Sequence, residues 1–240
     1  MVVPVVGAVL LARRNMEPPP PRFINSVNMH LVRILGGSVH PNDLPNGSGG
    51  FVAVDHDFYM SVSPVRQEDY LRVIGRNPSN PHYGDLIGPV ECVTVRKANE
   101  FCRLLSLRER RTYRLPTATE WKYAYFSGQV EALNEEDLGK IAWFKGNSRS
   151  RPQSVRQLLP DRWGLYDMIG NVRQWCSDSF PNPGSGSALA GGVMQKVEGT
   201  DYLTAGGDCL DPTKCEMECP PVTRLPTIGF RVVCEFFQPN

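Results

Sequence analysis

Residues 163–172 read WGLYDMIGNV, and this stretch decides how the rest of the chain is interpreted. Gly170 predicts a turn with positive φ, because a residue without a Cβ atom adopts that backbone conformation at no steric cost. Asn171, directly after it, offers a side-chain carbonyl oxygen and can hydrogen-bond to the local backbone. The stretch therefore predicts a tight turn with a polar side chain beside it.

A long helix is predicted upstream of this turn from the spacing of its apolar residues. Four of them fall at positions i, i+3, i+4 and i+7, which form one face of an α-helix. Because Cys102 lies on that face, it is interpreted as a small apolar core residue in preference to a reactive thiol. The four residues are Ala98, Phe101, Cys102 and Leu105.

Two other helix starts are predicted from end signals. Thr117 and Glu120 have the spacing of a capping box, in which each side chain bonds to the other residue's backbone N–H. An earlier helix is expected to open at Ser63-Pro64, with the hydroxyl as cap and the proline in the first turn. Gly75 is expected to end that earlier helix.

The composition is that of an ordinary globular protein. The chain has 240 residues, of which 41% are hydrophobic, enough to bury a core in one large domain or two small ones. Lysine and arginine number 26, aspartate and glutamate number 25, and the net charge is +1. No charge of one sign dominates, so neither nucleic acid nor a membrane surface is expected as a partner.

The N-terminal stretch differs from the rest of the chain. Residues 2–12 are apolar but shorter than the ~20 residues of a membrane-spanning helix, so no transmembrane segment is expected. Two arginines follow this run, the reverse of a signal peptide, and the compartment stays open. Four prolines at residues 18–21 favour an extended spacer. We interpret residues 1–22 as an arm, lying on a partner or on its own domain, and residues 23–240 as that domain.

Several motifs occur in a characteristic order along the chain. They are YRLPTATEW at 113–121, WGLYDMIGNV at 163–172, the pair Gly206-Gly207, and IGFRVV at 228–233. This order resembles the formylglycine-generating enzyme family, the sulfatase-modifying-factor domain. The resemblance implies an α+β fold, an elaborated C-type-lectin-like domain with two main helices, a small mixed sheet and long loops. The scarcity of long periodic strands agrees with such a fold.

The resemblance also implies a calcium ion near the turn at Gly170. The family often holds calcium there with an asparagine side chain, which is Asn171 here, main-chain carbonyls and an acidic residue that follows. In this chain Arg173 and Gln174 stand where the family usually has a tryptophan and a glutamate. Since calcium needs several oxygens, some of them charged, Asn171 stays a metal-ligand candidate while loop scaffold is its favoured interpretation.

Catalytic members of the family oxidise a substrate cysteine to formylglycine with oxygen and copper(I). They bind the copper through two cysteines spaced C-x4-C, because two soft thiolates must converge on one ion. Residues 206–219 here read GGDCLDPTKCEMEC, with spacings C-x5-C and C-x3-C. Cys209 and Cys215 are therefore catalytic candidates only if the chain is active, and we expect no cofactor.

The cysteines near residue 210 have other interpretations as well. Cys209, Cys215, Cys219 and Cys234 could form a four-sulfur zinc site, but their spacings lack the paired C-x2-C of such sites. A disulfide among them requires an oxidising compartment. Reduced thiols, partly in the core, are the favoured interpretation.

Two charged stretches have both a chemical and a structural interpretation. His56 lies between Asp55 and Asp57, but alternation along a strand would put the aspartates on one face and the histidine on the other. A solvated edge is therefore favoured over a proton relay. Residues 108–114, RERRTYR, carry four arginines, and a solvated turn is favoured over a phosphate site.

Two classes of function remain. The favoured hypothesis is a non-catalytic binding or assembly module, a pseudoenzyme that engages a protein partner or larger assembly through its arm and the loops of residues 176–228. The alternative is a copper-dependent oxidase that forms formylglycine. The binding surface is expected to be shallow and to contain Trp175, the segment from Asp208 to Cys219, and Arg231. The favoured interpretation of the individual residues is structural: Trp175 is expected in the core, and Arg231 is expected to pair with a core carboxylate.

Overall fold

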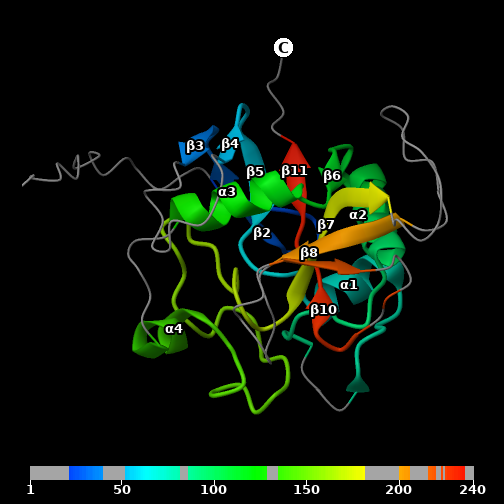
Figure 1. The fold of residues 1–240 in the computed structure, drawn as a ribbon. Helices are drawn as coiled ribbons and strands as arrows, with labels where there is room; N and C mark the ends of the chain where they lie inside the picture. Colours follow the sequence, from blue (N-terminus) through cyan, green and yellow to red (C-terminus); the bar gives the residue numbers. More distant parts are fainter. Residues whose placement is uncertain are drawn as a thin grey trace, which may run out of the picture.

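The computed structural model describes residues 22–39, 52–81, 86–128, 135–181, 200–205, 216–219, 223 and 225–235 (Figure 1). The helices are α1 (Gln67–Ile74), α2 (Val95–Glu109), α3 (Ala118–Gly128) and α4 (Glu135–Ile141). The strands are β1 (Arg22–Ile24), β2 (His30–Ile34), β3 (Gly37–Val39), β4 (Val52–Val54), β5 (Phe58–Ser61), β6 (Tyr113–Arg114), β7 (Arg173–Pro181), β8 (Thr200–Ala205), β9 (Glu216–Cys219), β10 (Ile228–Gly229) and β11 (Val233–Glu235).

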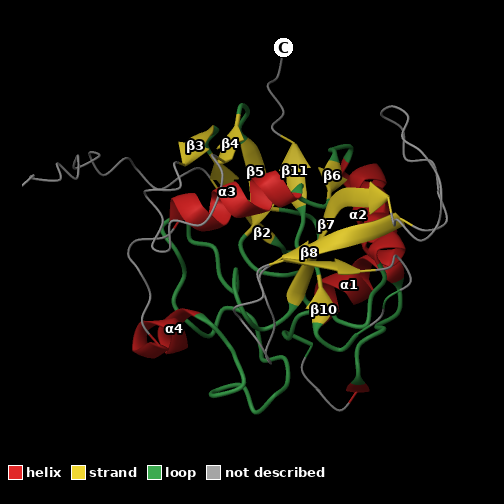
Figure 2. Ribbon diagram, viewed as in Figure 1, coloured by secondary structure: helices red, strands yellow, loops and turns green. Residues whose placement is uncertain are grey.

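The strands form separate small sheets (Figure 2). A five-stranded antiparallel sheet has the order β1-β2-β5-β11-β6. A four-stranded sheet has the order β10-β7-β8-β9, in which only the pair β10 and β7 is parallel. Strands β3 and β4 form an antiparallel pair. With α2 and α3 as the longest described helices, this arrangement confirms the predicted α+β fold class.

The five-stranded sheet separates two hydrophobic clusters. On β5, Phe58 and Met60 belong to the cluster that includes α3, whereas Tyr59 packs against the cluster that includes α1 and α2. On β11, Val233 and Cys234 divide between the two clusters in the same way. Because successive side chains of a strand point to opposite faces, each short strand supplies both clusters.

Helix α2 has the buried face that its sequence predicted. Ala98, Phe101 and Leu105 have no exposed surface, and Cys102 is only 3% exposed. The Oγ1 atom of Thr94 accepts a hydrogen bond from the backbone N–H of Lys97 at 3.2 Å and caps the first turn. Burial raises the pKa of the Cys102 thiol above its usual range, consistent with an inert core residue.

The predicted capping box at the start of α3 is confirmed. The Glu120 N–H donates to Thr117 Oγ1 at 3.0 Å, and the Thr117 N–H donates to Glu120 Oε2 at 2.8 Å. The same carboxylate accepts two hydrogen bonds from the Arg114 guanidinium, both at 2.7 Å. The start of α3 is thereby tied to β6.

The helix expected to open at Ser63-Pro64 begins later, and that prediction was wrong. Helix α1 starts at Gln67, after an N-cap at Arg66. The Val65 N–H donates to the carbonyl of Phe230 at 2.9 Å, so the chain is still extended along a distant segment at this point. Gly75 does end the helix, with φ of 82°.

The predicted arm lies almost wholly outside the described residues, which begin at Arg22 in β1. In that strand Arg22 pairs with Val32 of β2. None of the described helices combines the length and the apolar character needed to cross a membrane.

Candidate functional site

The turn at Gly170 is built as the sequence predicts. Gly170 has φ of 72°, and a Cβ atom there would lie 2.3 Å from the carbonyl oxygen of Trp143. Asn171 follows with φ of 58°, and its N–H donates to the same oxygen at 2.9 Å. The close approach of two backbone segments therefore requires glycine at this position.

The Asn171 side chain is fully buried, and both of its polar atoms are engaged. Its Oδ1 accepts a hydrogen bond from the Gln153 N–H at 2.9 Å. Its Nδ2 donates to the Gln153 carbonyl at 3.1 Å and to Asp167 Oδ1 at 3.2 Å. These contacts join the turn to the loop at Gln153, which is a scaffold role.

Gln174 and Arg231 form a second buried network beside the turn. The Nε of Arg231 donates to Gln174 Oε1 at 2.5 Å, and Trp121 Nε1 donates to the same oxygen at 3.0 Å. The Nε2 of Gln174 donates to the carbonyl of Asp167 at 2.8 Å. A neutral amide therefore links the terminal motif, helix α3 and the turn.

The Arg231 guanidinium is fully buried and is held mainly by carbonyl oxygens. It donates to the carbonyls of Ser61 at 3.0 Å, Tyr166 at 2.8 Å and Asp167 at 3.2 Å. Burial lowers the pKa of Arg231 to about 10, while the charges of Asp167 and Asp161 act in the opposite direction. Arg231 therefore stays protonated near neutral pH.

The shallow surface expected to contain Trp175 and Arg231 is not where these side chains lie. Trp175 has no exposed surface, and its Nε1 donates to the Val93 carbonyl at 2.9 Å. Arg231 is equally buried. Both side chains belong to the core because each has polar partners there. The core position favoured for each residue from sequence matches the structure, although Arg231 contacts carbonyls and an amide directly instead of a carboxylate.

The oxygens near Asn171 do not form a set that fits calcium. Asn171 Oδ1 accepts from Gln153, and Asp167 Oδ2 accepts from the Arg156 N–H at 2.9 Å. The carbonyls of Tyr166 and Asp167 face a guanidinium, which would repel a cation. Within the described residues, no group of three or more histidine, cysteine, aspartate or glutamate residues is placed to hold a metal ion.

The cysteine candidates lie mostly outside the described residues. Asp208, Cys209 and Cys215 are among the residues that are not described, and for Cys219 only the backbone in β9 is described. Cys234 lies in β11, in a different sheet from β9, and is fully buried. Burial raises the pKa of its thiol to about 11. The copper, zinc and disulfide hypotheses therefore stay predictions.

The histidine between two aspartates contacts one of them. His56 Nδ1 lies 2.8 Å from Asp55 Oδ1, and its Nε2 lies 3.2 Å from Glu120 Oε1. Asp57 is turned elsewhere and accepts from the Gly36 N–H at 2.8 Å and from Arg33. The pKa of His56 is raised, chiefly by its hydrogen bond to Asp55. This cluster joins the β4–β5 turn to the start of α3.

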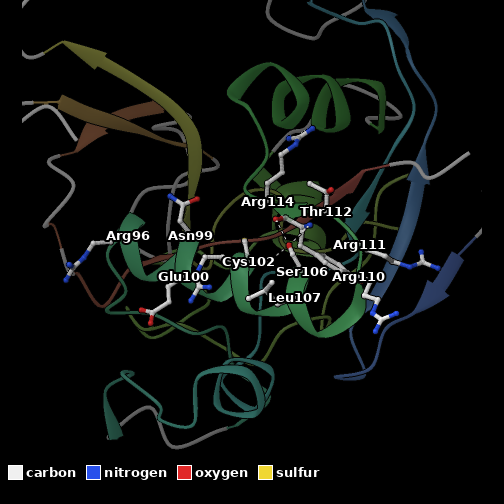
Figure 3. Close-up of a pocket in the computed structure, with 12 residues that line it drawn as sticks. Arg96, Asn99, Glu100, Cys102, Ser106, Leu107, Arg110, Arg111, Thr112 and Arg114 are labelled. Carbon is white, nitrogen blue, oxygen red and sulfur yellow. Dashed lines mark hydrogen bonds between the residues drawn. The ribbon is translucent and has the colours of Figure 1, made fainter. Parts of the chain in front are cut away.

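An open groove lies along the outer face of α2, beside β6 (Figure 3). It has a volume of about 760 Å³ and is lined by α2 and the segment that follows it. Arg96 and Arg110 stand at its two ends in the close-up (Figure 3). Other residues that line it include Asn99, Arg103, Ser106 and Leu107.

The arginines of the groove fall into two groups. Arg111 lies over the Phe23 ring, 5.0 Å from its centroid, and Arg114 is paired with Glu120. Arg96, Arg103 and Arg110 are exposed and have no carboxylate within 4.0 Å in the described part of the chain. The second group is available to bind an anionic partner.

Sequence reasoning missed this groove because it considered only the inner face of α2 and the RERRTYR stretch. The signal was present in the spacing of Arg96, Arg103 and Arg110, which recur every seven residues. This spacing places Arg96 and Arg103 on nearly the same side of α2, and Arg110 is the C-cap residue that follows the helix. The RERRTYR stretch is only partly solvated, since Arg111 and Arg114 are held by the fold.

Comparisons with known proteins identify the fold family. The model of the sulfatase-modifying factor enzyme 1-like domain matches residues 25–236. Among curated proteins, the chaperone protein LppX of Paenibacillus barcinonensis is 27% identical over 183 residues, covering 53% of this chain and 64% of that protein. The serine/threonine-protein kinase pkn1 of Chlamydia pneumoniae is 26% identical over 274 aligned positions, covering 95% of this chain and 40% of the kinase. The chain thus spans less than two thirds of either relative.

Solved structures support the same fold. Variable protein 1 of Treponema denticola has a TM-score of 0.71 and 23% identity, covering 91% of this chain and all of that one. PvdO of Pseudomonas aeruginosa has a TM-score of 0.72 and 22% identity, covering 92% of this chain and all of that one. These neighbours confirm the C-type-lectin-like fold predicted from sequence.

Proposed function

We propose that this chain, which belongs to the sulfatase-modifying factor enzyme 1-like domain family, is a non-catalytic module that binds a protein partner. The observation that carries the proposal is the open groove on α2, lined by three exposed arginines without a carboxylate partner in the described residues. Exposed, unpaired charge on a concave surface favours association with a partner of opposite charge.

The polar residues of the family motifs support a scaffold role in this proposal. Asn171, Gln174 and Arg231 are fully buried, and their hydrogen bonds all go to other parts of the same chain. A catalytic or ligand-binding group must reach its substrate. The chain has also replaced the glutamate usual at position 174, and its cysteine spacings differ from C-x4-C.

The relatives are compatible with binding but do not decide it. LppX is named a chaperone protein, a class that acts by binding other proteins, and it is 27% identical to this chain over 183 aligned residues. The kinase activity in the name of pkn1 refers to a protein of which this chain spans 40%. We carry over only the binding role, and we include the arm and the loops of residues 176–228 as further contact regions.

The alternative, a copper oxidase, is tested by activity. The purified full chain is incubated with copper(I), a reductant, oxygen and a cysteine-containing peptide, and formylglycine is measured by mass spectrometry. We expect no product above a metal-free control. Product that disappears in Cys209→Ser or Cys215→Ser would overturn the non-catalytic proposal.

Binding is tested in cells that naturally make the protein. Tagged wild-type chain is compared with R96E/R103E/R110E and with R149E/R151E/R162E, which has the same change in charge at three other exposed arginines. We expect one stoichiometric protein partner to co-purify with wild type and the control and to be lost from the groove variant. Absence of any stoichiometric partner from wild type would contradict the proposal.

A further inference from the structure

The groove of α2 has a regular pattern that specifies its occupant. Its lining residues from α2 include Arg96, Asn99, Arg103 and Ser106, which recur at intervals of three and four residues, and Arg110 is the C-cap residue directly after the helix. These intervals define one face of a helix, which adjoins the buried face. Arg96 and Arg103 are seven residues apart on α2, so their Cα atoms are separated by about 10 Å along the helix axis, and Arg110 continues this spacing in sequence at the C-terminal end of the helix.

The positive charge of this face is not cancelled by the one carboxylate of its lining. Glu100 is paired with Lys97 at 2.6 Å, on the same helix. The pKa of Glu100 is lowered first by Lys97 and to a lesser extent by the charges of Arg103 and Arg76. Glu100 therefore neutralises a lysine, and the arginine row keeps a net positive charge.

The adjoining sheet edge does not offer backbone groups to an extended peptide. Strand β6 is the last strand of its sheet. The Ser106 hydroxyl accepts from the Tyr113 N–H at 2.8 Å, and it shares its own proton between the Cys102 carbonyl at 2.7 Å and the Tyr113 carbonyl at 3.2 Å. Since a strand that adds to an edge needs those groups, the groove favours a partner bound through side chains.

Leu107 adds an apolar contact between the arginines. Its side chain is 66% exposed and lies in the groove. The aromatic residue of the lining, Tyr113, is only 3% exposed and offers no face on which a nucleic-acid base could stack. The combination of spaced positive charge and an exposed leucine fits an amphipathic protein segment better than a polyphosphate chain.

We propose that this groove binds an acidic helix of a partner protein, with carboxylates seven residues apart facing Arg96, Arg103 and Arg110 and an apolar side chain against Leu107. Two helices that cross at a small angle stay in register over two such repeats. The inference rests on the proposed function and names the chemistry of the partner. Because exposed ion pairs supply part of the affinity, binding should weaken as salt is raised.

The test uses the purified full chain and two labelled, stapled helical peptides of identical composition. One carries three glutamates seven residues apart and a leucine on the same face; the other carries the glutamates five residues apart, on different faces. Fluorescence anisotropy measures each Kd at 50 mM and 300 mM salt. We expect the first peptide to bind about tenfold more tightly than the second at low salt, as three exposed ion pairs would give.

Variants test whether the binding occurs at this groove. We expect R96E/R103E/R110E to weaken the first peptide at least about tenfold, and R149E/R151E/R162E to leave its Kd within about twofold. A peptide with lysines in place of the glutamates should bind the groove variant and not the wild type. This exchange also shows that the groove variant is folded.

Three results would overturn the inference. They are equal affinity for both glutamate peptides, equal loss in both triple variants, and tighter groove-dependent binding of single-stranded RNA than of the acidic helix. If the natural partner is still lost from R96E/R103E/R110E while the acidic helical peptide does not bind, the acidic helix is the wrong occupant of the groove and the proposed function stands.

Discussion

The arginine of the core and the arginines of α2 occupy opposite environments in the same protein. Arg231 is fully buried and gives its hydrogen bonds to Gln174 and to three carbonyls. Arg96, Arg103 and Arg110 are exposed in a groove and lack a carboxylate partner in the described residues. A satisfied buried arginine stabilises the fold, whereas an unsatisfied exposed arginine is available to a partner.

The largest effect is expected from removing the buried arginine. Arg231→Ala removes the guanidinium that donates to the carbonyls of Ser61 and Tyr166, takes one of two donors from the Asp167 carbonyl and from Gln174 Oε1, and opens a cavity. Loss of a buried charged hydrogen-bonding group costs about 3–5 kcal/mol of unfolding free energy. Urea denaturation measures the change. A loss under 1 kcal/mol would show that Arg231 does not hold the core together.

The turn beside this network provides the next comparison. In Gly170→Ala the residue must keep φ of 72°, and its Cβ would lie 2.3 Å from the Trp143 carbonyl oxygen. We expect a loss of about 2–3 kcal/mol in unfolding free energy. Gly75→Ala is the control, because Gly75 has φ of 82° but open space around it. Equal losses in the two variants would show that the close approach of Trp143 does not explain the requirement for glycine at position 170.

A smaller loss is expected at the start of α3. Thr117→Ala removes the acceptor for the Glu120 N–H but leaves the Glu120 carboxylate in place. Loss of such a cap costs about 1 kcal/mol. Thermal unfolding of Thr117→Ala and of Thr117→Ser shows whether Thr117 stabilises the helix by capping or by side-chain packing, because serine keeps the cap. If serine destabilises as much as alanine, packing and not capping explains Thr117.

The exposed histidine cluster should give a small dependence of stability on pH. The pKa of His56 is raised above its ordinary 6.5, first by Asp55, while burial opposes the shift. Its contribution is therefore present in full below pH 6.5 and is lost as the pH rises through the folded-state pKa. Comparing the unfolding free energy of wild type and His56→Gln between pH 5 and 8 measures it. If the difference in unfolding free energy between the two proteins grew with rising pH, the pKa of His56 would not be raised in the folded state.

The smallest effect on stability is expected on the outer face of α2. Arg103→Gln removes an exposed charge without an ion pair in the described residues, so the unfolding free energy should change by less than about 0.5 kcal/mol. Urea denaturation checks this against Arg231→Ala. A loss above 1 kcal/mol would place Arg103 among the residues that hold the fold.

The sequence predicted what depends on local spacing. The buried face of α2, the Thr117–Glu120 capping box and the turn at Gly170 were readable because periodicity and end signals act within a few residues. The family resemblance supplied the fold. The order of the strands is non-local, because β5 lies between β2 and β11, which come from opposite ends of the chain.

The sequence misplaced residues whose environment depends on that non-local order. Trp175 and Arg231 were named for a binding surface, although a core position was favoured for each, and each finds a backbone carbonyl in the core from a segment far along the chain. The start of α1 was misjudged because Val65 is bonded to Phe230. Arg103 and its neighbours were overlooked although their spacing was legible, since exposed polar positions on a helix are commonly only solvated.

The central claim is that the exposed face of α2 receives the partner. A photo-crosslinking residue placed at position 107 can be compared with one at position 159, since Leu107 and Leu159 are 66% and 60% exposed. With the acidic helical peptide bound, a crosslink from position 107 and none from position 159 is predicted. Equal yields at the two positions, or a bound peptide that crosslinks only from position 159, would contradict the account.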